Sequence, residues 1–575
     1  MNGNPISFQK HADAAADFLE TQQWGNESEA PEMCPPGRQT MQNKRCNVYN
    51  CDDFTLTELH VLLKHLKRNK ATGPDDIPME FFMWLDDLNL ARVLGLINFW
   101  WTRGEFPENK LDAYVASIYK KGDPKKQENY RPISLLCSIY KIYAAMIQRR
   151  LSEAIGSDIQ DTQYGFRRAR STIIPLACIK RLLERAEASQ NPMFMVFLDW
   201  EKAFDRIKQD KLLEALKRMA IPSKMIDAIA SFYKNPRFCV RVGQTQSNWR
   251  TQQRGIRQGC PLSPYLFIIL MTVMFRDIHD ELNLSRGTMN GISFTELLYA
   301  DDTALITNNV NAMNRLIAKI EEHAHYYGLN FNKTKCVAMC YNSDGKPSFP
   351  GGEFVTQAQE TIYLGSTVSS THNTRKEVCS KLSSCFAVMN KLNVFWSKSN
   401  CPPKFKIQVF DAVVRSKLVY GLEATQLPKY LLNKLDSFQL KGLRKILKLD
   451  TTFINRSNTN QKVFQESSRL RNPDCVPGKD VQPFSTYVRN KQQSLYKHIV
   501  RLTDDDPLRQ STLEPSSSVP CIITNKRVGR PRGKWAWDVI ESLYLDSGTG
   551  TKASFKLDPV AACNTMEPRI RNRLL

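Results

Sequence analysis

Tyr299-Ala300-Asp301-Asp302 joins two short apolar segments, residues 296–298 before it and residues 303–306 after it. Aspartate favours turns because its short side chain hydrogen-bonds its own backbone. The stretch therefore predicts a β-hairpin that carries two carboxylates at its tip. Adjacent carboxylates resist joint ionisation, so the pair indicates a bound cation, although taken alone the four residues would suit a solvated acidic turn.

A third aspartate, Asp199, follows the unbroken apolar run of residues 193–198. Such a run predicts a strand buried on both faces. Asp199 and Asp301 are 102 residues apart (301 − 199), which allows two strands of one sheet to bring them together. Mg²⁺ prefers a few carboxylates together with substrate phosphates and water, and a pair of such ions promotes in-line phosphoryl transfer. The pattern therefore predicts a Mg²⁺ site without His or Cys ligands.

The composition favours a polyanionic partner. The 575 residues include 80 Lys and Arg against 58 Asp and Glu, a formal charge of +22, and an excess of this size suits nucleic acid. The longest apolar run, residues 265–274, is too short to span a bilayer, and residues 1–9 do not form a signal peptide. The 15 cysteines lack zinc-site spacing. We therefore expect reduced thiols, no secretion and no membrane partner.

Loops and helices with basic side chains occur along the whole chain. Residues 119–124, 129–134 and 163–171 are basic loops interrupted by Gly or Pro, which suit phosphate contacts although each could equally be solvated surface. Beyond residue 375 the pattern is helical. The third of these helices, residues 435–449, carries Lys441, Arg444 and Lys445 on a face that suits either solvent or a nucleic-acid backbone. Residues 526–534, which include Arg530 and Arg532, are the densest basic stretch.

The sequence resembles the reverse transcriptases of non-LTR (LINE-type) retrotransposons over about residues 10–450 and in a patch near residues 487–542. The motifs that carry the resemblance occur in the family's order: residues 70–78, 129–136, 163–172, 197–199 with 204–205, 255–264, 299–302, 332–335 and 363–365. Each motif alone could arise by chance, whereas the ordered set is very specific.

This resemblance implies a right-hand polymerase fold of fingers, palm and thumb that copies template RNA into DNA from a primer or target-DNA end, using dNTPs. It places Asp199, Asp301 and Asp302 at the catalytic positions around two Mg²⁺ ions, for which Mn²⁺ can substitute; Asp302 is the least direct ligand. The other implied contacts are with triphosphate (Arg131), the incoming sugar (Phe204), the nascent base pair (Gln258 and Gly259), pyrophosphate (Lys335) and the primer end (Tyr363, Leu364 and Gly365).

Several of these residues also have ordinary structural interpretations. Phe204 and Tyr363 could be core aromatics, while Arg167 and Arg170 suit either template or solvent. A group II intron maturase would share the fold and the acidic hairpin, but it usually has Gly-Gly after the glutamine, where this sequence has Gly259-Cys260. A non-catalytic nucleic-acid-binding descendant of a polymerase is the remaining alternative.

We expect an α+β fold arranged as an N-terminal linker remnant (1–50), fingers and palm (51–370), helical thumb (371–450), linker (451–485), basic nucleic-acid-binding region (486–545) and tail (546–575). The chain resembles a polymerase fragment or remnant of a larger element. We expect no endonuclease within it, because the run Asp504-Asp505-Asp506 is more typical of a loop or helix cap than of a ligand set. A nuclear or cytoplasmic ribonucleoprotein is the expected setting, and the oligomeric state stays open.

Overall fold

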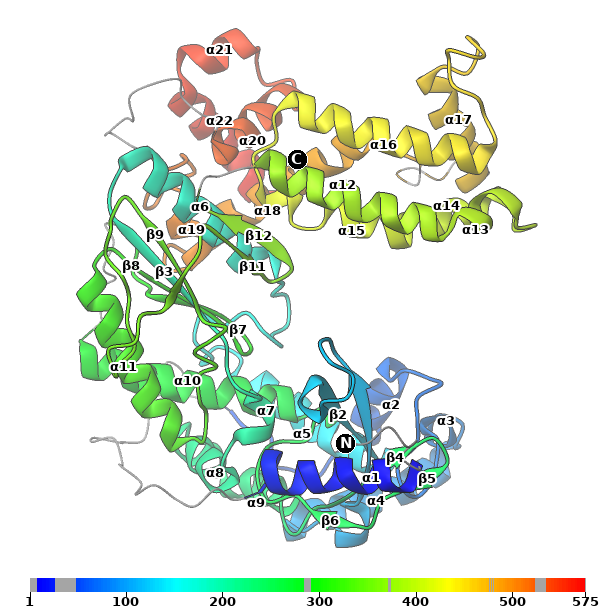
Figure 1. Cartoon of the computed structure of the whole chain (residues 1–575), viewed down its shortest axis with the longest axis vertical. Coiled ribbons are helices and arrows are strands. Elements are labelled where there is room, and N and C mark those ends of the chain that lie inside the picture. Colours follow the sequence, from blue (N-terminus) through cyan, green and yellow to red (C-terminus); the bar gives the residue numbers. More distant parts are fainter. Residues whose placement is uncertain are drawn as a thin grey trace.

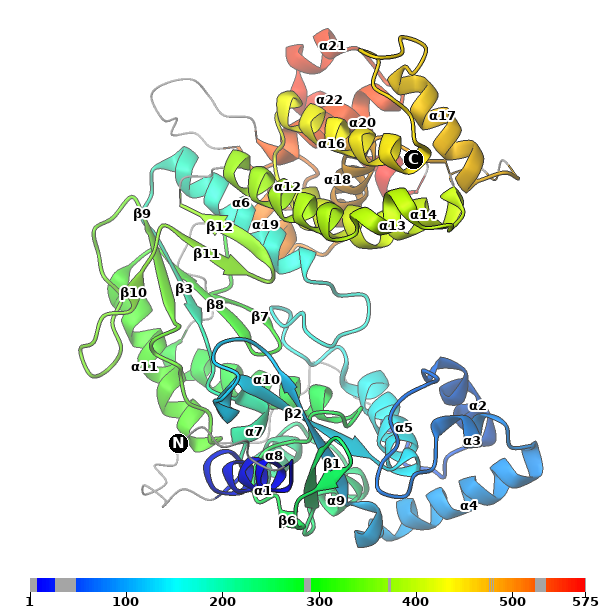
Figure 2. The same cartoon turned by 45° about the vertical axis from the view of Figure 1, so that its right-hand side comes forward.

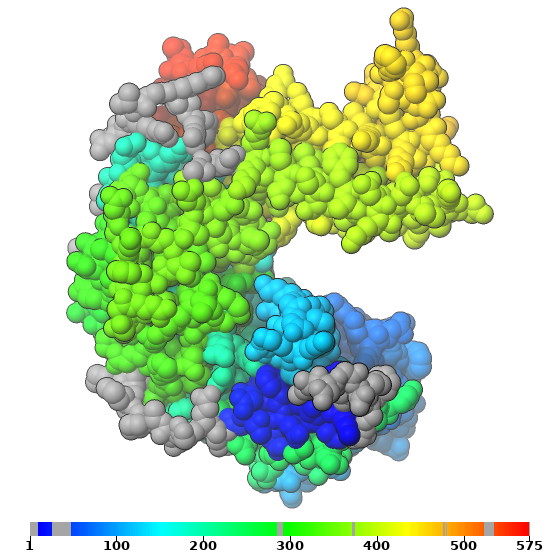
Figure 3. All heavy atoms as spheres, viewed as in Figure 1, coloured from blue at the N-terminus to red at the C-terminus, as the bar shows by residue number. Residues whose placement is uncertain are grey.

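The computed structural model of the chain describes residues 8–25, 48–283, 291–370, 374–474, 476, 478, 480–522 and 534–573 (Figures 1 and 2). Its elements curve into an open C around a wide opening (Figure 3). A five-stranded sheet lies at the back of the C, a second sheet with its helices forms the lower arm, and long helices form the upper arm (Figure 1). The expected α+β class and the palm, fingers and thumb arrangement are confirmed.

The palm sheet has the strand order β10-β9-β3-β8-β7. Its strands are β3 (Met193–Leu198), β7 (Glu296–Tyr299), β8 (Asp302–Thr307), β9 (Val337–Tyr341) and β10 (Thr356–Gln357). Strand β3 is antiparallel to both β8 and β9. The helices packed around this sheet are α6 (Ile173–Ser189), α7 (Ala203–Arg206), α8 (Gln209–Arg218), α10 (Ser263–Leu282) and α11 (Val310–Tyr326).

Side chains of β3 alternate between two apolar clusters. Phe194, Val196 and Leu198 pack in the cluster that holds α8, α10 and α11. Their neighbours Met193, Met195 and Phe197 face the opposite cluster, which holds α6. All six β3 residues are buried, which confirms the prediction of a strand covered on both faces. Asp199 therefore leaves the sheet from a rigidly packed strand.

The fingers are built on a sheet with the order β2-β1-β4-β5, in which β6 also pairs with β4. The strands are β1 (Ala113–Tyr119), β2 (Tyr130–Leu136), β4 (Arg237–Val242), β5 (Thr245–Gln246) and β6 (Arg250–Thr251). The helices are α2 (Leu56–His65), α3 (Met79–Met83), α4 (Asp87–Arg103), α5 (Ser138–Ile155) and α9 (Ser223–Ser231). The N-terminal helix α1 (Phe8–Phe18), continued by a π-helical turn (Leu19–Gln23), packs against β4 through a small apolar cluster.

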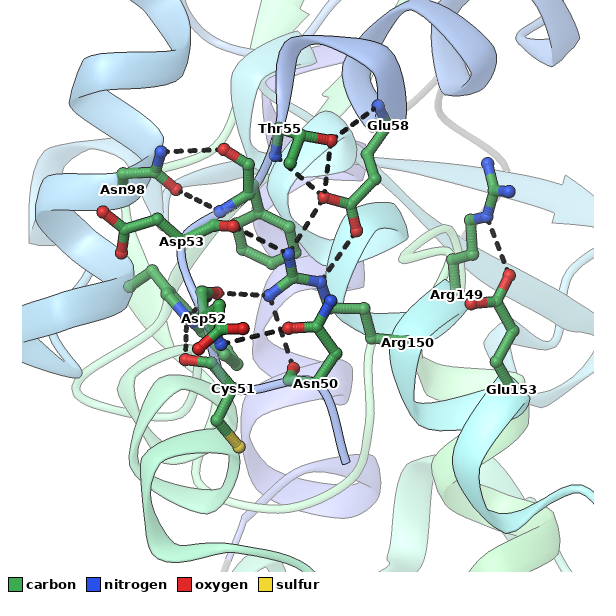
Figure 4. A network of polar contacts seen from close by, with 12 residues as sticks. Asn50, Cys51, Asp52, Asp53, Thr55, Glu58, Asn98, Arg149, Arg150 and Glu153 are labelled. Atoms are coloured by element: carbon green, nitrogen blue, oxygen red, sulfur yellow. Dashed lines mark hydrogen bonds and ion pairs between the residues drawn. The ribbon is translucent and has the colours of Figure 1, made fainter. Parts of the chain in front are cut away.

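Arg150 on α5 connects the segment before α2 to the fingers (Figure 4). Its guanidinium donates to both carboxylate oxygens of Glu58 at 2.8 and 2.9 Å and to the backbone carbonyls of Asn50, Asp52 and Asp53. Glu58 also completes a capping box, because its carboxylate accepts the Thr55 N–H while the Thr55 hydroxyl accepts the Glu58 N–H. One buried cation thus fixes the start of α2 on α5.

A two-stranded ribbon and the thumb helices follow the palm. The ribbon is β11 (Glu360–Tyr363) with β12 (Ser366–Ser369). The thumb contains α12 (Thr374–Lys391), α13 (Asn393–Lys398), α14 (Pro403–Val409), a π-helical segment (Phe410–Arg415), α15 (Ser416–Val419) and α16 (Lys429–Leu447). The thumb helices share one apolar cluster. Helix α17 (Asn460–Arg471) lies inside the expected linker, and its Val463 packs in this thumb cluster.

The C-terminal helices return to the palm. They are α18 (Phe484–Arg501), α19 (Pro507–Thr512), α20 (Trp535–Asp546), α21 (Lys552–Leu557) and α22 (Pro559–Arg571). Each of these helices contributes buried apolar residues to the cluster that lies on the α6 side of β3, while Phe484 and Val488 of α18 pack with the thumb helices. Arg170 pairs with Asp506 at 2.9 Å, and the Arg181 guanidinium lies 4.5 Å from the Trp535 ring centre. Across the described residues, no helix combines the length and apolar character needed to cross a membrane.

Candidate active site

Strand pairing brings the acidic residues to one end of the palm sheet. Leu198 on β3 pairs with Thr303 on β8, so Asp199 and Asp302 each lie one position beyond this pair. Tyr299 pairs with Asp302, which leaves Ala300 and Asp301 as a two-residue turn. The predicted hairpin and the predicted convergence of the two acidic strands are confirmed.

The acidic turn is held by a neighbouring loop. Ala300 has a left-handed φ of 57°, which a residue with a side chain adopts only when the surroundings enforce it. Gln163, which is fully buried, accepts the N–H groups of Ala300 (2.9 Å) and Gly165 (2.8 Å) on its side-chain oxygen. A Cβ on Gly165 would lie 2.3 Å from the Ala300 nitrogen. Gln163 and Gly165 therefore fix the backbone of the turn that carries Asp301.

Crowding and mutual repulsion raise the pKa values of the hairpin acids. Desolvation by surrounding protein atoms is the largest cause for both, although both side chains reach solvent. Desolvation combines with the charges of Asp301 and Asp199 to raise the pKa of Asp302 to about 6. For Asp301, desolvation and Asp199 raise the pKa against the lowering effect of Lys120 and Arg131. Both hairpin acids therefore resist ionisation in the metal-free protein, which is the condition that favours a bound cation.

Cationic side chains surround the acids. Lys335 Nζ lies 3.7 Å from Asp199 Oδ2. Lys120, at the end of β1, has its pKa lowered by desolvation and then by the charges of Arg131 and Lys335. Lys120 was recognised in the sequence only as part of a basic loop, and its approach to the palm acids depends on how the fingers pack. Together these three cations form a positive rim that suits a phosphate chain.

The loop with Gln258 and Gly259 docks against β2. The Ser134 N–H donates to the Gln258 carbonyl at 2.7 Å. Gly259 has a φ of 134°, and a Cβ there would lie 2.3 Å from the Ser134 carbonyl oxygen, so only glycine fits this approach. The contact holds Gln258 beside the strand that carries the exposed Arg131.

Phe204 and Tyr363 are both tied into aromatic packing. Phe204 is half-buried and stacks on Phe267, with ring centres 4.8 Å apart. Tyr363 is buried and lies 5.3 Å from the Phe197 ring centre. Leu364 and Gly365 form the turn between β11 and β12, and both have positive φ. Phe204 is therefore only partly covered by its neighbours, whereas Tyr363 belongs to the core.

The residues that we expect to contact nucleic acid differ in their exposure and in their hydrogen bonds. Arg167 donates to the carbonyls of Gly156, Gln160 and Gln163. Arg444 on α16 donates to the Asn458 carbonyl at 2.8 Å, Lys441 is exposed and Lys445 is half-buried on the same helix. Arg530 and Arg532 lie outside the residues that the structure describes.

The run of three aspartates has structural roles at two positions. Asp506 caps α19 by accepting the Leu508 N–H and also pairs with Arg170. Asp504 pairs with Arg509 at 2.7 Å and accepts the Ser516 hydroxyl. These contacts match the expectation of a loop or helix cap.

The acid set fits a hard cation that completes its coordination with substrate. Among the described residues, no three His, Cys, Asp or Glu side chains are arranged as a ready-made metal cage. Mg²⁺ typically takes one or two carboxylates plus phosphate and water oxygens. Carboxylates that meet at adjoining strand ends supply that donor chemistry, so Asp199, Asp301 and Asp302 fit Mg²⁺ bound together with a triphosphate.

Comparisons with known proteins agree with this geometry. Residues 120–368 match the family described as "Reverse transcriptase (RNA-dependent DNA polymerase)". The chain is 26% identical over 413 residues to the RNA-directed DNA polymerase from mobile element jockey of Drosophila funebris, covering 69% of this chain and 44% of that protein. It is 25% identical over 312 residues to the Pol polyprotein of retrotransposable element R2 of Nasonia vitripennis, covering 52% and 30%.

Among solved structures, telomerase from Candida albicans aligns with a TM-score of 0.37 and 14% identity over 70% of this chain and 66% of that one. The chain spans less than half the length of the two retrotransposon relatives.

Proposed function

We propose that this chain, which matches the reverse transcriptase family over residues 120–368, is the RNA-directed DNA polymerase of a non-LTR retrotransposon. The observation that carries the proposal is the meeting of Asp199 with the Asp301–Asp302 hairpin at adjoining strand ends, opposite a cationic rim. An acid cluster facing cations suits a reaction in which a metal-bound triphosphate is attacked by a hydroxyl.

Two Mg²⁺ ions, when bound, would lower the cost of charge build-up on the attacking and leaving oxygens. Asp199 and Asp301 would hold them, with Asp302 contributing less directly, and Mn²⁺ would substitute. Arg131 and Lys120 would orient the triphosphate. Lys335, 3.7 Å from Asp199, would act as the general acid that donates a proton to the departing pyrophosphate.

Selection of dNTPs would depend on Phe204 and on the Gln258–Gly259 loop. Phe204 stacks on Phe267, which prevents its ring from rotating away and supports its use as a steric barrier to a 2′-hydroxyl. The loop docks on β2 and would pack against the nascent base pair. The turn formed by Tyr363, Leu364 and Gly365 would contact the primer end, and its orientation is supported by a bond of 2.7 Å from the Tyr420 hydroxyl to the Leu364 carbonyl.

Template RNA would enter across the fingers. A groove of about 880 Å³ lies between α2, α5 and the loop at residues 166–170, and its lining includes Arg149, Arg167, Arg168 and Arg170. Arginines along a groove suit a phosphate backbone. Lys441, Arg444 and Lys445 on the thumb and Arg530 and Arg532 near the C-terminus would add contacts to the template–primer duplex or to target DNA. A nuclear or cytoplasmic ribonucleoprotein follows from these partners.

The decisive experiment is primer extension on poly-rA/oligo-dT with Mg²⁺. Wild-type protein should extend the primer, and Asp199→Ala or Asp301→Ala should reduce extension to background while leaving template binding largely intact. Asp344→Ala, in the loop after β9 and away from the acids, is the matched control and should extend normally. Near-normal extension by either active-site variant would refute the proposed catalytic role of these aspartates. A wild-type protein that binds template without extending the primer would favour a non-catalytic nucleic-acid-binding protein.

A further inference from the structure

Asp205 is a buried carboxylate that accepts side-chain hydrogen bonds from distant parts of the chain, namely from Gln23, Trp24 and Gln258. It lies on α7, next to Phe204, and is 3% exposed. Its Oδ1 accepts the Trp24 indole N–H at 3.0 Å, and its Oδ2 accepts the Gln258 side-chain N–H at 2.8 Å. Burial raises the pKa of Asp205 to about 6, and the bonds from Trp24 and Gln258 act in the opposite direction.

Trp24 comes from the N-terminal segment, residues 8–25, which is anchored at several points. Trp24 is buried and packs edge-to-face on Phe238 of β4, with ring centres 4.7 Å apart. Its carbonyl accepts the Arg254 N–H at 3.1 Å, four residues before Gln258. Arg250 pairs with Asp17 and Glu20 of the same segment. The indole is therefore held in place relative to the loop that carries Gln258.

Gln258 is restrained at both of its polar ends. Its backbone carbonyl accepts the Ser134 N–H from β2, and its side-chain amide donates to Asp205. A glutamine amide has two N–H donors and one carbonyl acceptor. Because an ionised Asp205 can only accept hydrogen bonds, the Gln258 amide nitrogen must face it, and the amide oxygen points away from Asp205.

We propose that Asp205 is a positioning residue for Gln258 and that Trp24 locks Asp205 in place, so that the N-terminal segment takes part in nucleotide selection. This inference rests on the proposed polymerase function. The carboxylate orients the Gln258 amide toward the nascent base pair, and the indole N–H prevents the carboxylate from rotating away. Residues 8–25 thereby act on the nucleotide site without touching substrate.

Trp24→Phe tests the relay at the residue farthest from substrate. The variant keeps an aromatic ring against Phe238 but deletes the N–H that Asp205 Oδ1 accepts. In single-nucleotide incorporation we expect the KM for the correct dNTP to rise about fivefold, the loss that one hydrogen bond of about 1 kcal/mol predicts, with kcat within about twofold. Misincorporation should rise, and the Kd for primer–template should stay unchanged.

Trp101→Phe is the matched control. Trp101 is equally buried, and its indole N–H donates to the carbonyls of Cys51 and Asp52 in the fingers. Both variants delete one buried indole donor, so a purely structural role predicts the same loss of stability and no change in KM for either. An unchanged KM in Trp24→Phe, or an equal rise in Trp101→Phe, would overturn the inference.

A double-mutant cycle separates positioning from general damage. In a Gln258→Ala background there is no amide to orient, so Trp24→Phe should no longer change the KM for dNTP. Asp205→Asn gives a second route, because its amide nitrogen must face at least one of the donors around it. Its effect on the KM should also vanish in the Gln258→Ala background. Additive effects in both cycles would refute the relay, whereas a wild type that extends no primer would refute the proposed function instead.

Discussion

Replacing Arg150 should release the start of α2 from the fingers. Arg150→Met keeps an apolar stem but removes five hydrogen bonds, two to Glu58 and three to backbone carbonyls. Breaking a buried ion pair from one side costs about 3–5 kcal/mol. The Glu58 side chain is 25% exposed and can regain water, so we expect the lower end, about 3 kcal/mol.

Hydrogen exchange followed by mass spectrometry measures this loss locally. Since 1.4 kcal/mol corresponds to a factor of ten, amides of α2 and of the facing part of α5 should exchange roughly 100-fold faster in Arg150→Met, while palm amides keep their protection. The adjacent Arg149→Met is the control (Figure 4). Arg149 forms an exposed pair with Glu153, which is worth about 0.3–0.5 kcal/mol. A less than fivefold change in Arg150→Met, or equal changes in both variants, would refute the reasoning.

Four further outcomes are expected. Phe204→Val should admit ribonucleotides, measured as the rNTP/dNTP incorporation ratio, and unchanged discrimination in a folded variant would place the barrier elsewhere. Because the pKa of Asp302 is raised from 3.8 to about 6, the metal-free protein should lose stability relative to Asp302→Asn as pH rises through 6; a pH-independent difference in Tm would contradict this. Purified protein should leave supercoiled plasmid closed with Mg²⁺ or Mn²⁺, and nicking that survives Asp301→Ala would reveal an endonuclease. The logarithm of nucleic-acid affinity should fall with the logarithm of salt concentration by about 0.7–0.9 per phosphate neutralised, and that slope should flatten when five basic residues are replaced by Gln: Lys526, Arg527, Arg530, Arg532 and Lys534.

Local sequence patterns predicted the elements that carry the acids. The apolar run before Asp199 and the alternation of turn and strand around Asp301 are determined by neighbours in sequence, and the structure has β3 and the β7–β8 hairpin at those residues. The capping box before α2 is a local feature of the same kind, since Thr55 and Glu58 are three residues apart.

Contacts across long sequence separations could not be predicted in this way. Gln163 supports Ala300 across 137 residues and Trp24 reaches Asp205 across 181. No periodicity encodes such a pairing, because it depends on how separate elements pack. In the sequence Asp205 is simply the residue after Phe204, and what distinguishes it is its burial among donors from distant segments. Likewise, the apolar residues of the C-terminal helices gave no sign that they would cover the palm.

The apolar cluster shared by the palm and the C-terminal helices has a consequence for the design of truncated fragments of this protein. The family match ends at residue 368, yet the apolar cluster on the α6 side of β3 continues into residues of α18, α20 and α22. A fragment ending at the match would expose that face to water, and an apolar face of this kind favours aggregation. The limit of sequence similarity is therefore not a limit of folding, and expression of the catalytic half calls for the distant helices as well.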